Sequence, residues 1–118
     1  MNRSGVRAQG YLMFLVAVVL LPVLAFAGEA KTTAELENFV IQDCGSCHGL
    51  TFKGGLGPPL RPSDLEPLPE AAISAIIREG VPGTAMPPWK ALLTDREIAW
   101  ISNQLKTGAL LDNSTRSQ

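Results

Sequence analysis

Histidine, cysteine and methionine are scarce in this chain. Its 118 residues contain one histidine and two cysteines, and a single methionine, Met86, follows residue 27. A structural zinc site takes four ligands, so two cysteines and one histidine fall one short. Any metal chemistry must therefore rest on very few side chains.

An excess of charge of one sign is also lacking. The chain has ten Lys and Arg residues and eleven Asp and Glu residues. Two of the basic residues, Arg3 and Arg7, lie near the start. The part of the chain after residue 27 therefore carries a net charge of −3. A mildly acidic domain is poorly suited to nucleic acid, which proteins hold largely through Lys and Arg.

The first 27 residues have the pattern of a secretory signal peptide. Basic residues precede an apolar run over 11–27, which closes on the small-residue pattern Ala25-Phe26-Ala27. This pattern indicates cleavage before Gly28. The alternative is an uncleaved membrane anchor, which needs about 20 apolar residues. Cleavage predicts export to a bacterial periplasm and one small domain over residues 28–118, with no membrane contact.

Strand patterns are missing from the rest of the chain. Apolar residues recur every three or four positions in segments 31–49, 68–80 and 92–108, which is the spacing of helices. Loops rich in Gly and Pro separate these segments, and the polar tail over 109–118 is expected to fray. The sequence predicts an all-α domain of three main helices. Its apolar residues look too few to fill the centre alone.

Two of the predicted helices begin with a capping box. Thr32 pairs with Glu35, and Thr94 pairs with Glu97 at the same spacing. In the middle helix Gly80 marks the end. Its apolar stripe is expected to consist of Ile73, Ile76 and Ile77.

Both cysteines and the histidine stand in one short motif. Cys44-Gly45-Ser46-Cys47-His48 has the C-x-x-C-H pattern of covalent haem attachment. Residues three apart on one helical turn face the same way, so both sulfurs can reach the vinyl groups of one porphyrin edge. His48 can then offer an imidazole nitrogen to the iron.

Three other uses of the two thiols are weaker. A disulfide between residues three apart closes a very small loop and stabilises little. A thioredoxin-like dithiol needs a βαβ setting, and a zinc site lacks its fourth ligand. We therefore expect one covalent haem c, bound through Cys44 and Cys47.

Met86 is the expected second axial ligand. It lies in a loop stiffened by Pro82, Pro87 and Pro88. A lone methionine is often core filler, but this setting favours a thioether that binds iron opposite His48. His/Met ligation raises the reduction potential. Because it also fills both axial positions, it favours electron transfer over catalysis.

The two loops should supply the rest of the site. The second nitrogen of His48 should donate to a carbonyl, and the Gly-Pro-Pro loop after the motif is the natural source. Leu60 and Trp89 are expected to pack on the porphyrin, with a surface position as the alternative for Trp89. Lys53 and Lys90 either form a basic rim for a partner or are scattered solvated lysines.

These motifs give the chain after residue 27 a resemblance to a class I cytochrome c. The resemblance rests on Cys44, Cys47, His48, Gly57-Pro58 and Met86. It implies helices wrapped round one haem and a Pro58 carbonyl that accepts from His48.

The same resemblance implies that the first and last helices, Thr33–Asp43 and Asp95–Lys106, cross. At the crossing, Leu36 and Val40 would contact side chains of the last helix. These side chains would be Ile98, Ile101 or Trp100.

The residues around the motifs carry a narrower resemblance. They read QDCGSCHGLTFKGGLGPPL and PGTAMPPWKALLTDREIAWI. Both are similar to the small periplasmic monohaem cytochromes of denitrifying bacteria, the NirC type, which are encoded with the haem c/haem d nitrite reductase. The resemblance implies a carrier that gives electrons to that reductase in a transient encounter, and we expect a monomer. Two alternatives stay open: an accessory factor in making the reductase's specialised haem, and a haem sensor or enzyme with a labile Met86.

Overall fold

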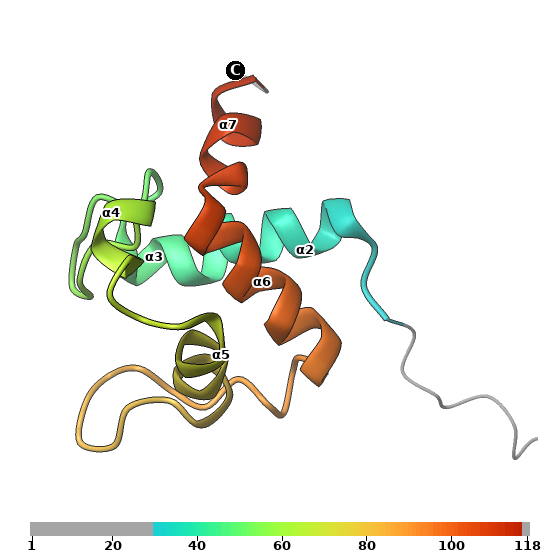
Figure 1. Ribbon diagram of the computed structural model, residues 1–118. Coiled ribbons are helices and arrows are strands. Elements are labelled where there is room, and N and C mark those ends of the chain that lie inside the picture. Colours follow the sequence, from blue (N-terminus) through green and yellow to red (C-terminus); the bar gives the residue numbers. More distant parts are fainter. Residues whose placement is uncertain (1–29, 117–118) are drawn as a thin grey trace, which may run out of the picture.

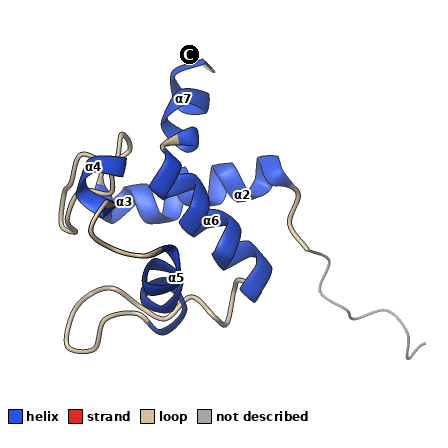
Figure 2. Ribbon diagram, in the orientation of Figure 1, coloured by secondary structure: helices blue, strands red, loops and turns tan. Residues whose placement is uncertain are grey.

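The described part of the chain is built from helices and loops (Figures 1 and 2). The structure is a computed structural model that describes residues 30–116, and no strand occurs among them. The all-α prediction is therefore confirmed. The predicted signal peptide, residues 1–27, lies outside the described residues. None of the helices within 30–116 is long and apolar enough to cross a membrane.

The first helical segment runs without a break from residue 33 to residue 48. It comprises α2 (Thr33–Phe39), a π-helical turn η1 (Val40–Cys44) and α3 (Gly45–His48). Thr32 caps its start through the predicted box. The Thr32 hydroxyl accepts from the Glu35 N–H at 3.3 Å, and the Glu35 carboxylate accepts from the Thr32 N–H at 2.8 Å. Because the helix continues to His48, the whole C-x-x-C-H motif is helical.

The middle helix α5 (Glu70–Glu79) packs against α6 (Asp95–Thr107). Ile73 and Ile77 are buried, as expected, but Ile76 is 39% exposed, so the predicted stripe is too wide. At 100° per residue, Ile76 lies about 100° round the helix from Ile77, at the edge of the buried face. A hydrogen bond of 2.8 Å between the Ser74 and Ser102 hydroxyls joins the two helices.

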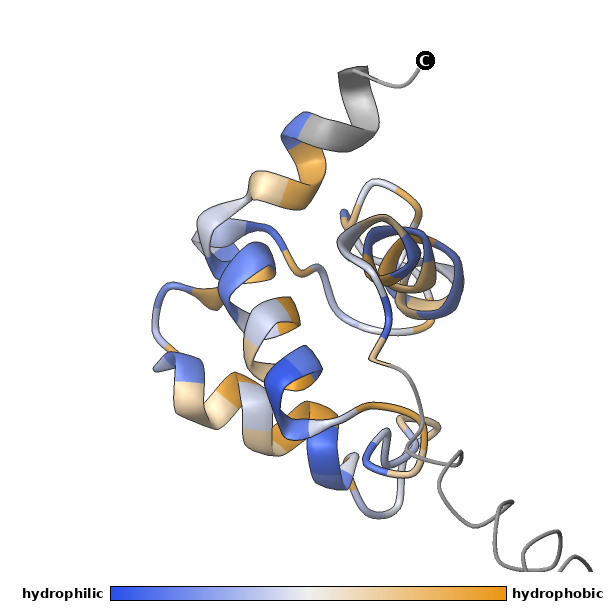
Figure 3. Ribbon diagram, turned by 90° about the vertical axis from the view of Figure 1, so that its right-hand side faces the viewer, coloured by the Kyte–Doolittle hydropathy of each residue, from blue (hydrophilic) through white to orange (hydrophobic). Residues whose placement is uncertain are grey.

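The predicted crossing of the first and last helices is present. Figure 1 shows α6 crossing in front of α2, and buried side chains of both helices belong to one core cluster. From α2 and η1 come Leu36 and Val40, and from α6 come Ile98 and Ile101, with Trp100 partly buried against them. Figure 3 shows hydrophilic and hydrophobic segments alternating along the helices, as amphipathic helices round a core require.

The C-terminal tail differs from the expectation. Residues 109–118 were predicted to fray, but Ala109–Arg116 forms helix α7, which extends from the end of α6 (Figure 1). Leu110 is 1% exposed and Leu111 packs against the core cluster. This burial stabilises the start of a helix that its polar sequence alone would not. Gly108, with φ of 79°, makes the turn between α6 and α7.

A short helix inside a predicted loop was also missed. It is α4 (Pro62–Leu65), with Pro62 at its first position. The Arg61 guanidinium pairs with the Asp64 carboxylate at 2.7 Å, and Leu65 is buried. The rest of the region between α3 and α5 is irregular, as the Gly and Pro content predicts.

Candidate functional site

The two cysteines lie one helical turn apart where η1 passes into α3. Both are half-buried free thiols, so the disulfide alternative is not supported. Burial raises the pKa of the Cys44 thiol to about 11, and the charge of Asp43 adds to the shift. A thiol with a raised pKa stays protonated near neutral pH and is a weak nucleophile, which argues against a reactive dithiol. Among residues 30–116 no group of three or more His, Cys, Asp or Glu side chains is placed to hold a metal ion.

His48 is buried and its ring is fixed by one hydrogen bond. The distance from His48 Nδ1 to the Pro58 carbonyl oxygen is 2.7 Å. A carbonyl oxygen only accepts, so Nδ1 must carry the proton and donate it. The other ring nitrogen, Nε2, then keeps its lone pair. This is the tautomer of a metal-binding histidine whose second nitrogen is tied to the protein, and it is the contact that the sequence predicted.

The loop over 49–60 folds tightly back on the motif. The Gly57 N–H donates to the Cys47 carbonyl at 2.8 Å, and the Gly54 N–H donates to the His48 carbonyl at 2.8 Å. A Cβ at Gly57 would lie 2.7 Å from Cε1 and Nδ1 of the His48 ring. Sequence reasoning missed this role of Gly57. The glycine-rich stretch was the available signal, but only the fold shows which glycine meets the ring.

Leu60 and Trp89 are both partly buried against the core cluster. The Trp89 ring contacts Phe39 edge-to-face, with centroids 5.4 Å apart. Trp89 is therefore not the freely exposed aromatic of the alternative interpretation. Contact of either side chain with a porphyrin remains a prediction.

Met86 is half-buried on the loop between α5 and α6. In Figure 1 this loop extends to the lower left, on the same side of the drawing as α3 and α4. The Met86 N–H donates to the Thr84 hydroxyl at 3.3 Å. Lys90, at the end of the loop, forms an ion pair with Glu79 at 2.6 Å. This pairing weakens the idea of a basic rim made by Lys53 and Lys90.

A porphyrin fits the chemistry that surrounds the motif. Two free thiols stand on one turn, and a histidine keeps Nε2 available beside them. Large apolar side chains are left open to solvent in the loop that follows, where Leu50 is 61% and Leu56 is 92% exposed. Exposed apolar surface of this kind is typical of a ligand or partner site.

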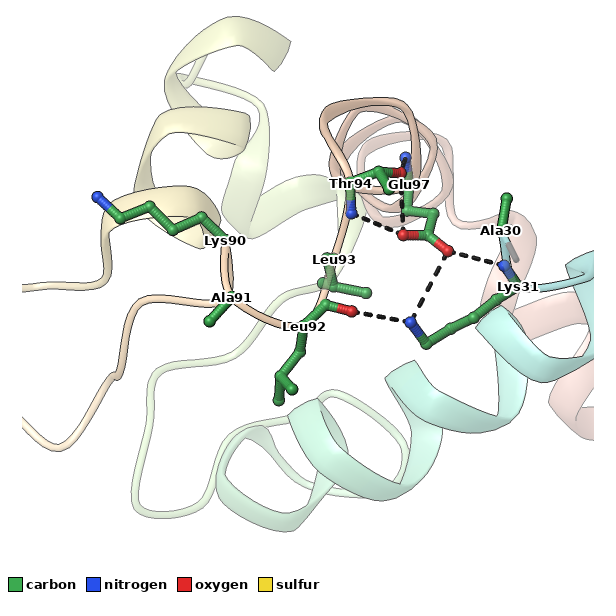
Figure 4. Close-up of a pocket in the computed structure, with 8 residues that line it drawn as sticks. All are labelled: Ala30, Lys31, Lys90, Ala91, Leu92, Leu93, Thr94 and Glu97. Atoms are coloured by element: carbon green, nitrogen blue, oxygen red, sulfur yellow. Dashed lines mark hydrogen bonds and ion pairs between the residues drawn. The ribbon is translucent and has the colours of Figure 1, made fainter. Parts of the chain in front are cut away.

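A separate pocket of about 290 Å³ lies at the start of α6 (Figure 4) and includes none of the motif residues. Glu97 fills part of it: its carboxylate accepts from the Lys31 N–H at 3.0 Å and the Thr94 N–H at 2.7 Å. The Lys31 ammonium donates to the Leu92 carbonyl at 2.8 Å. The polar groups of this pocket are therefore already paired with one another. Their hydrogen bonds connect the segment before α2 to the start of α6.

Comparison with known proteins agrees with the motif. Residues 31–103 match the family described as cytochrome C oxidase, cbb3-type, subunit III. The chain is 41% identical over 107 residues to cytochrome c55X of Stutzerimonas stutzeri, covering 91% of this chain and 89% of that protein. A solved structure of c-type cytochrome NirC shares 43% identity with a TM-score of 0.64, covering 65% of this chain and 91% of that one.

A further match reaches one part of a much larger protein. The dihydro-heme d1 dehydrogenase of Pseudomonas aeruginosa is 39% identical over 77 residues, which is 65% of this chain and 15% of that protein. The family match and the likeness to cytochrome c55X and NirC determine the assignment. The chain belongs to the c-type cytochromes, has the class I fold, and is an electron-transfer protein that carries one haem c on Cys44 and Cys47.

Proposed function

We propose that this protein is a periplasmic one-electron carrier in which His48 and Met86 are the axial ligands of the haem iron. The observation that carries the proposal is the 2.7 Å hydrogen bond from His48 Nδ1 to the Pro58 oxygen. It leaves the lone pair of Nε2 free to bind a metal and increases its basicity. When bound, the haem supplies an iron that changes between the ferric and ferrous states.

The chain's own residues would set the properties of that iron. The Met86 thioether favours ferrous iron and so raises the potential. With His48 and Met86 both holding the iron, the protein would leave oxygen no open site. Cys44 and Cys47 fix the porphyrin edge covalently, so a protein outside the cytoplasm does not lose its cofactor.

We place the carrier in the nitrite reductase pathway, with that reductase as electron acceptor. The support is the likeness to cytochrome c55X and to NirC, together with the signal-peptide pattern of residues 1–27. Export would put the protein in the periplasm. A small, transient contact suits a carrier that must release its partner after each electron.

Rapid mixing tests this function. Reduced protein is mixed with the haem c/haem d nitrite reductase, and in parallel with an exported oxidant from an unrelated pathway. We expect oxidation by the reductase to be at least about tenfold faster, because specific docking raises the encounter rate. Equal rates with both oxidants would contradict the assignment of the acceptor.

A second function, in the maturation of the reductase's specialised haem, is favoured by the match to dihydro-heme d1 dehydrogenase. As a maturation factor, the chain would accept electrons during synthesis of that haem. Deletion of the gene separates the two functions. Loss of the reductase's specialised haem, with electron supply intact, would support maturation. A complete reductase that receives electrons slowly would support the carrier.

A sensor or enzyme with a labile Met86 is the third possibility. Ferrous protein that binds carbon monoxide readily would favour it. Ferrous protein that binds carbon monoxide poorly would favour the carrier, since both axial positions are then occupied.

A further inference from the structure

The loop that carries Met86 is closed by backbone hydrogen bonds at its base. The Val81 N–H donates to the Met86 carbonyl at 3.1 Å, and the Trp89 N–H donates to the Ile77 carbonyl at 3.1 Å. A weaker bond of 3.4 Å runs from the Lys90 N–H to the Arg78 carbonyl. The segment that leaves α5 therefore returns to the last turn of the same helix. None of these bonds involves the Met86 sulfur.

Gly80 lies at the point where the returning chain touches α5. It is buried and has φ of 68° and ψ of −169°, a conformation open to glycine and strained for other residues. A Cβ at this position would lie 2.6 Å from the Met86 oxygen, 2.6 Å from the Pro87 carbonyl carbon and 2.7 Å from the Pro88 nitrogen. These three atoms belong to the backbone, so no side-chain rotation can relieve the contact.

The returning chain has little freedom to move away. Pro87 and Pro88 each fix φ near −65°, and each restricts the residue before it. On one side Trp89 is held against Phe39. On the other, the Thr84 hydroxyl donates to the Val81 carbonyl at 2.7 Å and accepts from the Met86 N–H. The backbone position of Met86 is thus set by contacts within the protein.

We propose that Gly80 is a positioning residue for Met86. Its missing side chain leaves the space that the Met86–Pro88 backbone occupies, and the loop closes there whether or not the sulfur binds iron. This inference rests on the proposed axial role of Met86. It adds that the ligand is held ready by the protein, so the iron does not have to organise the loop.

The test compares Gly80→Ala with Gly83→Ala in the haem-loaded protein. Gly83 lies in the same loop and also has a positive φ, 77°, but an added Cβ there meets nothing within 4 Å. The control therefore introduces backbone strain without the collision. The readouts are the ferric methionine–iron charge-transfer band, the midpoint potential and carbon monoxide binding to ferrous protein.

We expect Gly80→Ala to shift the equilibrium about tenfold or more toward iron without Met86, because the strain and the collision act together. The charge-transfer band should weaken, the potential should fall and carbon monoxide should bind more tightly. The charge-transfer band, the midpoint potential and carbon monoxide binding of Gly83→Ala should stay close to those of the native protein. Equal behaviour of the two variants would overturn the proposal.

Met86→Ala separates this inference from the proposed function. If Met86→Ala leaves the band and the potential unchanged, the axial assignment itself fails. If it removes the band while Gly80→Ala matches Gly83→Ala, the ligand stands and the positioning role fails.

Hydrogen exchange in Met86→Ala gives a second test that does not require Gly80→Ala to fold. We expect the Val81 and Trp89 amides to stay as protected as in the native protein, because their bonds do not involve the sulfur. Rapid exchange at both amides would mean that iron ligation holds the loop, and would refute the inference.

Discussion

At the scale of single residues, two glycines matter through the atoms they lack. Gly57 leaves room for the His48 ring, whose Nδ1 donates to Pro58. Gly80 leaves room for the backbone that carries Met86. Each of the two proposed iron ligands is therefore placed by a neighbour without a side chain. A ligand whose position is fixed in advance needs little rearrangement when the iron changes charge.

Gly57→Ala should destabilise the haem-loaded protein by about 1–3 kcal/mol, the usual cost of overpacking a tight site. The added Cβ would lie 2.7 Å from the His48 ring, so the ring must turn and its hydrogen bond to Pro58 must lengthen. Denaturant unfolding measures the change. The control is Gly45→Ala, where the added Cβ would lie 3.3 Å from Cδ2 and 3.4 Å from Cα of Leu50, a much milder contact. If both variants unfold like the native protein, the steric role of Gly57 is wrong.

At the scale of helices, local chemistry determines where each element starts. Both capping boxes predicted from Thr32–Glu35 and Thr94–Glu97 are present. The second box does more than cap α6, because the Glu97 carboxylate also accepts from the Lys31 N–H and so joins α2 to α6. Burial alone would raise the pKa of Glu97, but hydrogen bonds from Thr94 and Lys31 hold it below its ordinary value.

Glu97→Gln should lower stability at neutral pH and reduce the loss of stability in acid. Because the folded protein lowers the pKa of Glu97, its carboxylate stabilises the fold above the ordinary value of 4.5. That contribution disappears as pH falls through the lowered value, so native and variant should converge. Thermal unfolding at neutral and acid pH measures the difference.

Glu35→Gln is the matched control for this prediction. Glu35 occupies the same position in the capping box of α2, and its pKa is also lowered through hydrogen bonds to Thr32, but it is exposed and joins no second helix. A smaller effect at Glu35 is expected. Equal losses of stability in the two variants would mean that the hydrogen bond between Glu97 and Lys31 adds nothing beyond the capping of α6.

Features that depend on a few neighbouring residues could be predicted from the sequence, and features that depend on the folded chain could not. The motif and the caps depend on short spacings along the chain and were predicted from them, whereas the Pro58 carbonyl was predicted from the resemblance to class I cytochromes c. The Lys90–Glu79 ion pair and the contact of Gly80 with Met86 depend on how one loop turns back on its own helix, and the burial of Leu110 depends on where α7 meets the core. Neither spacing nor composition encodes such contacts. The predicted roles of Leu60 and Trp89 toward the porphyrin stay predictions.

At the scale of the whole molecule, the core is small and one helical segment carries the attachment motif. The buried apolar side chains of α2, α5 and α6 meet in a single cluster, against which Cys44 also packs. The motif is therefore continuous with the core. Loss of one sulfur anchor should affect the entire fold.

Cys47→Ala should yield little mature haem-loaded protein, because a single thioether remains and the domain depends on its cofactor to complete the interior. Haem-stained gels, normalised to total protein, measure the loss. Ser46→Ala is the control between the two cysteines: it removes an exposed hydroxyl that donates to the Asp43 carbonyl at 2.7 Å and to the Cys47 sulfur at 3.9 Å, and it leaves both thiols in place. Full haem content in Cys47→Ala would contradict the need for two anchors.

After the turn at Gly108, α7 lies at the top of Figure 1, whereas α3 lies to the left and the loop that carries Met86 lies at the lower left. A linker fused beyond Arg116 would consequently anchor the molecule to an electrode by its far end. Immobilised in that orientation, the cytochrome would present its redox face to the solution, where currents to candidate partners can be recorded directly.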